Sequence, residues 1–268
     1  MRVFQVDRVI FADKWQDYFG EHGLREFEDF YNYEAGEVVN VNTKRNVCMM
    51  RLGGNDEQKV FYMKRFHWPH LKDMVSALRK FGRLTSQARV EWNNANTLLE
   101  NGIDTYKPVC LGEHIVCGVD TKSLVITEEL KAISMLDYVV RRWRDLGRER
   151  QEEMVTCIGK LIRKVHRLDI SLPDLYIWHV FVDEKELPEQ CRLSLIDLHR
   201  MGVGVTNRWQ KAKELGRLCW SLDEGYFDEK LREILVTTYA EGGWFGDMDM
   251  LMRGVRRSVR KVRQRRCL

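Results

Sequence analysis

Apolar and polar residues alternate along much of the first half of the chain, which is typical of half-buried β-strands. Turn-forming residues at 53–56 join two of these alternating runs, as in a meander of antiparallel strands. A further short strand, followed by a helix, is expected within 1–35. We therefore predict a small antiparallel sheet built from the runs at 37–41, 46–52, 59–66, 108–112 and 123–128.

Apolar residues at spacings of three and four predict helices over most of the remaining chain. One such stripe, at 85–100, interrupts the strands. The most regular stripe runs from 151 to 168, with seven apolar residues on one face. Further helices are expected near Ser134, at 211–222, at 227–239 and in the C-terminal segment. Strands followed by helices predict an α+β fold.

Composition narrows the class of protein. The 268 residues are enough for a large core or for two lobes that share a cleft, and 44% hydrophobic with 31% charged residues is ordinary for a soluble enzyme. No uninterrupted apolar run reaches the roughly 18 residues of a membrane-spanning helix, and the charged N-terminal segment does not resemble a secretory signal. The seven cysteines are scattered singly, which argues against a disulfide framework or a zinc site. These features predict a cytoplasmic location.

The net charge of +4 comes from one end of the chain. Residues 253–268 hold eight Lys or Arg and no acid, and the other residues include 36 basic and 40 acidic side chains. One interpretation is a terminal helix that packs through its valines and leaves a solvated outer face. A second is binding to an anionic membrane surface through residues 253–266. Nucleic-acid binding ranks last, and we do not expect it.

The chemistry predicted for the chain centres on residues 171–200. Asp174 and His179 form a D-x-x-x-x-H pattern, and Asp197 follows a short apolar run at 193–196. In protein-kinase-like phosphotransferases an Asp of the pattern D-x-x-x-x-N accepts the proton of the substrate hydroxyl, and a second Asp after a strand holds Mg²⁺. Here a His stands at the Asn position. Two aspartates in loops at strand ends would be the alternative interpretation.

Three further features follow in the order of a kinase. Lys64 lies near the end of the third strand, where kinases place the lysine that neutralises ATP phosphates. Glu91 lies at the edge of the helical stripe at 85–100 and is a candidate ion-pair partner for Lys64. The connector Glu128, Glu129 and Leu130 stands where a kinase hinge would bind adenine through its backbone. Taken singly, the lysine and the glutamate would be interpreted as solvent-facing charges.

Together these residues resemble the lipopolysaccharide kinases, the heptose/Kdo kinase group of Gram-negative bacteria, over roughly residues 35–222. The resemblance is carried by Lys64, RVEW at 89–92, ITEEL at 126–130, DLYIWHVF at 174–181 and IDLHR at 196–200. It implies a bilobal, protein-kinase-like fold, with an N-lobe of residues 1–130 built on a small antiparallel sheet and a mainly helical C-lobe of residues 131–268.

The resemblance also implies an activity and its residues. Asp174 would be the catalytic base, His179 and Asp197 would lie at Mg²⁺, and Lys64 with Glu91 would orient the phosphates of ATP. The expected reaction is ATP-dependent phosphorylation of a heptose or Kdo hydroxyl in the inner core of lipopolysaccharide. The protein would then act at the cytoplasmic face of the inner membrane, as a peripheral protein.

Several residues depart from the pattern of this family. Leu172-Pro173 precede the catalytic Asp in place of His-Arg, and Lys213-Glu214 replace a Lys-Asp pair whose Asp braces the catalytic loop. No glycine-rich phosphate loop is visible at 42–46, where Lys44 and Arg45 could contact phosphate instead. These differences leave two alternatives open: a kinase for a protein or another small molecule, and a pseudokinase that binds nucleotide without transferring phosphate.

Overall fold

The computed structural model describes residues 5–41, 45–54, 58–67, 86–117, 119–185 and 191–266. Contacts divide the chain into two compact units. Unit 1 comprises residues 1–100 and 106–130, and unit 2 comprises residues 101–105 and 131–268. Residues 101–105 cluster with unit 2 because they contribute strand β5 (Asp104–Thr105), which pairs with a strand of that unit.

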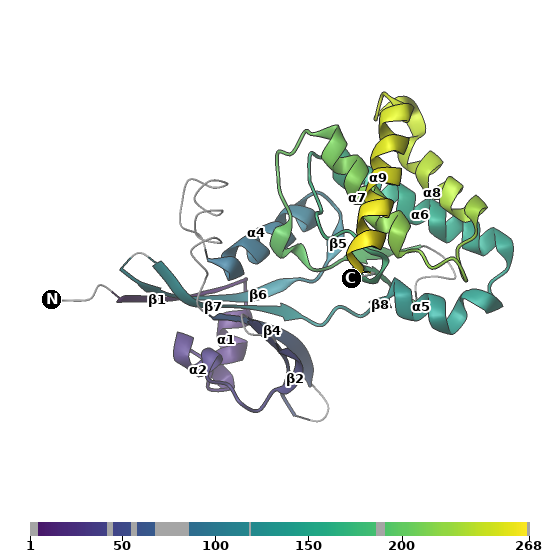
Figure 1. Ribbon diagram of the computed structural model, residues 1–268. Helices are drawn as coiled ribbons and strands as arrows, with labels where there is room; N and C mark the ends of the chain where they lie inside the picture. Colours follow the sequence, from purple (N-terminus) through teal and green to yellow (C-terminus); the bar gives the residue numbers. More distant parts are fainter. Residues whose placement is uncertain are drawn as a thin grey trace. The chain divides into compact units, whose positions relative to one another are not determined.

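Unit 1 contains an antiparallel sheet in the order β1-β6-β7-β4-β3-β2 (Figure 1). The five strands predicted from alternation are all present, and the expected N-terminal strand pairs with β6 at the edge of the sheet. The strands are β1 (Gln5–Phe11), β2 (Glu37–Val41), β3 (Arg45–Leu52), β4 (Lys59–His67), β6 (Pro108–Val116) and β7 (Val119–Glu128).

Two short helices, α1 (Trp15–Glu21) and α2 (Phe27–Tyr31), replace the single helix expected within 1–35. Gly23 has a left-handed φ of 77°, which ends the first helix at little steric cost. Glu26 and Asp29 then form a capping box that starts the second. Both helices pack their phenylalanines against one face of the sheet.

The opposite face of the sheet carries α4 (Gln87–Glu100), which lies within the stripe predicted at 85–100. Ala88 and Trp92 of α4 pack with Phe66, Leu111 and Val125 of the sheet in a cluster separate from that of α1 and α2. Burial on both faces fixes the register of the strands. The register then determines where Lys64 of β4 lies.

Unit 2 is mainly helical and includes a small sheet in the order β5-β10-β9-β8 (Figure 1). The strands β8 (Ile133–Ser134), β9 (Val180–Val182) and β10 (Leu193–Leu195) are only two or three residues long. The α-helices are α5 (Met135–Arg142), α6 (Arg148–Arg167), α7 (Arg208–Ser221), α8 (Glu229–Ala240) and α9 (Met248–Arg266).

The helices of unit 2 pack in pairs through glycines. A Cβ added at Gly159 of α6 would lie 3.0 Å from the Leu235 carbonyl oxygen of α8. A Cβ at Gly216 of α7 would lie 2.6 Å from Cβ of Ser258 in α9. These close approaches fix α6 and α7, between which the chain carries the predicted catalytic loop. Within the described residues, the search for a helix long and apolar enough to cross a membrane found none.

Candidate functional site

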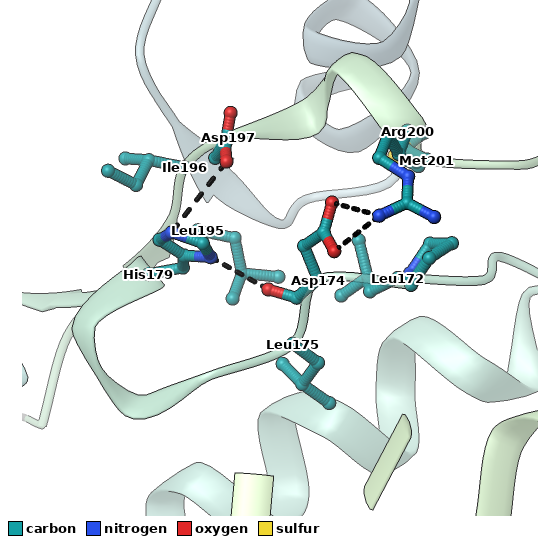
Figure 2. A pocket seen from close by; sticks show the side chains of 10 residues that line it. Leu172, Asp174, Leu175, His179, Leu195, Ile196, Asp197, Arg200 and Met201 are labelled. Carbon is teal, nitrogen blue, oxygen red and sulfur yellow. Dashed lines mark hydrogen bonds and ion pairs between the residues drawn. The ribbon is translucent and has the colours of Figure 1, made fainter. Parts of the chain in front are cut away.

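A hairpin in unit 2 positions the predicted catalytic residues. Strands β9 and β10 pair antiparallel, with Val180 opposite Leu195, and the Thr105 hydroxyl donates to the Leu195 carbonyl at 2.5 Å. Asp174 lies in the loop before this hairpin, and Asp197 follows β10. Both line a pocket that also includes His179 and Arg200 (Figure 2).

Asp174 is held by an arginine from the Asp197 loop. Arg200 Nη1 donates to both carboxylate oxygens of Asp174, at 2.8 and 3.2 Å (Figure 2). The carboxylate is therefore oriented and charge-balanced although Leu172-Pro173 stand in place of His-Arg. The Asp174 side chain is 20% exposed, so its oxygens remain reachable from the pocket.

His179 links the two aspartates. Its Nδ1 lies 2.7 Å from the Asp174 carbonyl oxygen, which accepts only, so Nδ1–H is the donor. In the neutral imidazole Nε2 then carries the lone pair, and it lies 3.7 Å from Asp197 Oδ2. Two acceptors that face each other at this distance suit either a cation or a protonated imidazole.

Asp197 has an unusual backbone conformation. Its φ of 60° and ψ of 57° are left-handed, which aspartate tolerates better than most residues with a Cβ. The His199 Nδ1–H donates to Asp197 Oδ1 at 2.8 Å and fixes the carboxylate. Strained backbone at a polar pocket is a common feature of functional sites.

The donor set of the pocket fits Mg²⁺. Each of Asp174, Asp197 and His199 offers a ligand atom within 4.8 Å of the others. Mg²⁺ prefers oxygen ligands and is usually bound by one or two carboxylates together with water and substrate phosphates. Asp197, alone or with Asp174, meets that requirement. His199 joins them in this group, whereas His179, the histidine predicted from sequence, lies beside it.

A buried glutamate holds the loop before Asp174. Glu214 of α7 accepts hydrogen bonds from the Ser171 hydroxyl at 2.5 Å and the Leu172 amide at 2.9 Å. Burial alone would raise the pKa of Glu214, but His166, 3.2 Å away, and these two donors outweigh it and lower the pKa. Glu214 thus stays charged and braces the loop.

The predicted phosphate-orienting pair forms within unit 1. Lys64 of β4 donates to Glu91 Oε1 of α4, and the Tyr106 hydroxyl donates to the same oxygen at 2.7 Å. Glu91 is buried and the Lys64 side chain is 17% exposed. The structure thus excludes the alternative interpretation, in which Lys64 and Glu91 were separate charges facing solvent.

The predicted hinge lies at the end of β7, also in unit 1. The Glu128 amide donates to the Lys107 carbonyl at 2.9 Å, and the Glu129 amide donates to the Val60 carbonyl at 3.1 Å. Both N–H groups are thus already hydrogen-bonded to carbonyl groups of unit 1. Leu130 is the last residue of this unit. Of the two residues suggested as substitutes for a glycine-rich loop, Arg45 begins β3, and Lys44 lies outside the described residues.

The sequence did not predict roles for two residues that hold the aspartates. Arg200 and His199 follow Asp197 at once, and the IDLHR string contained both, but no spacing rule connects Arg200 to a carboxylate 26 residues earlier. The signal available was the missing arginine before Asp174. Because no arginine precedes Asp174, a basic residue from elsewhere in the chain could be expected to pair with its carboxylate.

Comparisons with known proteins point to one family of kinases. The model of the lipopolysaccharide kinase (Kdo/WaaP) family matches residues 29–239. Lipopolysaccharide core heptose(I) kinase WaaP of Escherichia coli K12 is 27% identical over 224 residues, which cover 75% of this chain and 81% of the relative. The protein of the same name from Pseudomonas aeruginosa is 30% identical over 167 residues, covering 55% and 62% of the two chains.

Among solved structures, WaaP in complex with acyl carrier protein matches with a TM-score of 0.70 and 20% identity, covering 95% of this chain and 98% of the other. This likeness confirms the predicted bilobal, kinase-like α+β fold. The matched family and the named relatives are kinases, so the chain is a phosphotransferase that acts on a sugar hydroxyl and has a kinase-like fold. The chain belongs to the lipopolysaccharide kinase (Kdo/WaaP) family, because the family model spans most of it.

Proposed function

We propose that the protein phosphorylates a heptose or Kdo hydroxyl in the inner core of lipopolysaccharide, with ATP as donor and Mg²⁺ as cofactor. The convergence of Asp174 and Asp197 on one pocket, in a chain of this family, carries the proposal. Relatives from two bacteria are named as heptose(I) kinases, which makes heptose the first acceptor to test.

Each residue of the pocket has a role in the proposed reaction. Asp174, oriented by Arg200, would accept the proton of the acceptor hydroxyl as the hydroxyl oxygen attacks the γ-phosphorus of ATP. The bond between the γ-phosphorus and the bridging oxygen breaks, and ADP leaves. Asp197, fixed by His199, would hold the metal, with Nε2 of His179 beside it. When bound, Mg²⁺ neutralises charge on the phosphates of ATP. Phosphoryl transfer depends mainly on such positioning, so a rigid hairpin is a suitable scaffold.

Residues of unit 1 hold the donor nucleotide in this proposal. Lys64, kept in place by Glu91 and Tyr106, pairs with the α- and β-phosphates. Because the amides of Glu128 and Glu129 already serve the sheet, the adenine edge would contact their carbonyl groups and the Leu130 backbone. The proposed adenine contact thus stays with residues 128–130, but it uses carbonyl groups in place of the amides of Glu128 and Glu129.

We further propose that the basic face of α9 rests on the anionic inner surface of the inner membrane, where a lipid-linked acceptor would be found. Val255 is buried, and the Ser258 hydroxyl donates to the Lys213 carbonyl of α7, so one face of α9 packs on unit 2. The other face exposes several cations, including Arg256, Arg257, Arg260 and Lys261. The sequence analysis treated packing and membrane contact as alternatives. In this proposal they involve different faces of one helix.

The acceptor is tested by incubating the protein with Mg·ATP and dephosphorylated core oligosaccharide, and in parallel with a protein extract, and locating the new phosphate by mass spectrometry. We expect one phosphate on a core sugar. Phosphate on protein would favour the kinase with another acceptor. Nucleotide binding without transfer to either would favour the pseudokinase.

A further inference from the structure

Three aromatic side chains cluster immediately beyond Asp174 in unit 2. The rings of Tyr176 and Trp178 are stacked, with centroids 4.7 Å apart and planes inclined by 8°. Trp220, near the end of α7, meets Trp178 edge-on at 6.3 Å and Tyr176 at 6.2 Å. All three residues are half-buried.

Asp174 and the two stacked residues alternate with core residues along the loop. Leu175 and Ile177 are buried in the core, whereas Asp174, Tyr176 and Trp178 are half-buried. The half-buried positions of this loop thus include both Asp174 and the stacked residues.

The cluster also touches the pocket itself. The His179 ring, which lines the pocket with Asp174, packs edge-on against both Tyr176 and Trp178, with centroids 6.0 Å apart in each case. The stacked rings therefore lie directly against a residue that lines the pocket.

The cluster is anchored to a braced helix. The Ile177 amide, between the two stacked residues, donates to the Ser221 hydroxyl at 2.8 Å, and that hydroxyl donates to the Leu218 carbonyl at 2.7 Å. Ser221 follows Trp220 in α7, the helix whose Glu214 holds the start of the loop. The start and the middle of the predicted catalytic loop are thus fixed to one helix, which gives the rings a fixed position relative to Asp174.

We propose that Tyr176, Trp178 and Trp220 form a platform that binds a sugar ring of the acceptor and thereby determines which hydroxyl reaches Asp174. This inference rests on the proposed function, since it assigns the acceptor side of the same site. The C–H faces of a pyranose are apolar and stack on aromatic rings, while its hydroxyls stay at the rim. Aromatic side chains have few rotatable bonds, so they order a flexible oligosaccharide at little entropic cost to the protein.

The test compares tryptophan substitutions at the two ends of one helix. Trp220→Leu removes a ring of the platform, and Trp209→Leu removes a half-buried ring at the start of α7 as the matched control. Trp178→Leu removes the aromatic face at this position, whereas Trp178→Phe keeps a smaller one. The acceptor is deacylated core oligosaccharide, measured both by steady-state transfer and by direct calorimetric binding without ATP.

For Trp178→Leu and Trp220→Leu we expect KM and Kd for the oligosaccharide to rise about 3- to 10-fold. KM for ATP should stay within twofold of the wild-type value, Trp178→Phe should recover most of the loss, and Trp209→Leu should match wild type. Unchanged KM and Kd for the oligosaccharide in both leucine variants would overturn the inference. A rise in KM for ATP alone would also overturn it, because the platform would then bind the nucleotide.

Two other outcomes separate this inference from the proposed function. If the leucine variants lose affinity only for acylated lipopolysaccharide and not for the deacylated oligosaccharide, the platform binds lipid chains and the inference fails. If wild type binds the oligosaccharide through these rings but transfers no phosphate to it, the inference stands and the proposed function fails.

Discussion

At the scale of single residues, the pocket shows how this chain replaces a missing arginine. Arg200 reaches Asp174 from the loop that carries Asp197, so one ion pair connects Asp174 to that loop. Half-exposed ion pairs add little stability. We therefore infer that Arg200 contributes to orientation rather than to folding.

Substituting Arg200 should lower activity without unfolding the protein. For Arg200→Met we expect kcat to fall by about 10- to 100-fold because Asp174 loses its orientation, with the melting temperature nearly unchanged. Arg200→Lys should recover part of the loss, since lysine supplies charge but not the paired geometry. The control is Arg192→Met, which removes an exposed pair with Asp104 elsewhere in unit 2. Equal kcat in wild type and Arg200→Met would refute this role.

Asp120 of β7 gives a pH dependence of stability. Burial raises the pKa of Asp120 to about 7, against the hydrogen bond from Ser123 and with the help of the nearby Glu113 charge. A carboxyl whose pKa rises on folding stabilises the protein most below its unfolded pKa of 3.8, and this stability is lost as pH rises toward 7.

Asp120→Asn should remove that dependence. We expect the variant to be roughly 2 kcal/mol more stable than wild type at pH 8 and no more stable at pH 4, because the amide is neutral at both. Hydrogen exchange of the β6 and β7 amides measures the free energy of opening in unit 1. A variant that is less stable than wild type at pH 8 would contradict the prediction.

At the scale of elements, α7 organises unit 2. Its Glu214 braces the start of the catalytic loop, its Ser221 anchors the middle, and its Gly216 allows close contact with α9. The amphipathic pattern predicted this helix, but it did not predict that one helix would perform three tasks. These three tasks depend on the residues that each face of α7 contacts in the folded protein. The periodicity of apolar residues does not identify those contacts.

Replacing Glu214 by Gln should weaken unit 2 in a pH-dependent way. A buried carboxylate with a lowered pKa contributes stability above its unfolded pKa of 4.5, which is lost as pH falls through the folded value. We expect a loss of about 3 kcal/mol at pH 7 and a smaller difference from wild type at pH 4. Urea unfolding at the two pH values measures both, and an equal loss at pH 4 would refute the electrostatic explanation.

Gly216 tests the contact between α7 and α9. In Gly216→Ala the new methyl group would meet the Val255 carbonyl oxygen at 2.7 Å, so the helices must separate. Overpacking of this kind costs about 1 to 3 kcal/mol. The control is Gly147→Ala, where no atom lies within 4 Å of the added Cβ. Equal melting temperatures of the two variants would show that the contact is more adaptable than its geometry implies.

At the scale of the whole molecule, the sequence predicted the order of elements better than their contacts. Alternation located the strands of unit 1, and the kinase order of Lys64, Glu91, Asp174 and Asp197 indicated the family. Sequence did not predict the break between α1 and α2, which depends on a single left-handed glycine. Nor did it predict the Arg200 contact, because the hairpin that brings Arg200 to Asp174 exists only after β9 and β10 pair.

The membrane proposal is tested on the intact chain. Replacing Arg256, Arg257, Arg260 and Lys261 by Gln leaves the packed face of α9 in place. We expect weaker flotation with vesicles that contain anionic lipid, by about 1 kcal/mol for each charge near the surface, and no binding to neutral vesicles by either protein. The wild-type interaction should also weaken as salt increases. Equal flotation of the two proteins would exclude this face as the contact.

We propose Asp174 as the base of a sugar kinase, and a single transfer assay tests this role. Transfer of labelled phosphate from Mg·ATP to dephosphorylated core lipopolysaccharide is compared for wild type and Asp174→Asn, with ATP binding followed in both. We predict transfer by wild type, and a loss of at least about 100-fold in the variant with ATP binding preserved. Transfer by Asp174→Asn at the wild-type rate would contradict the claim.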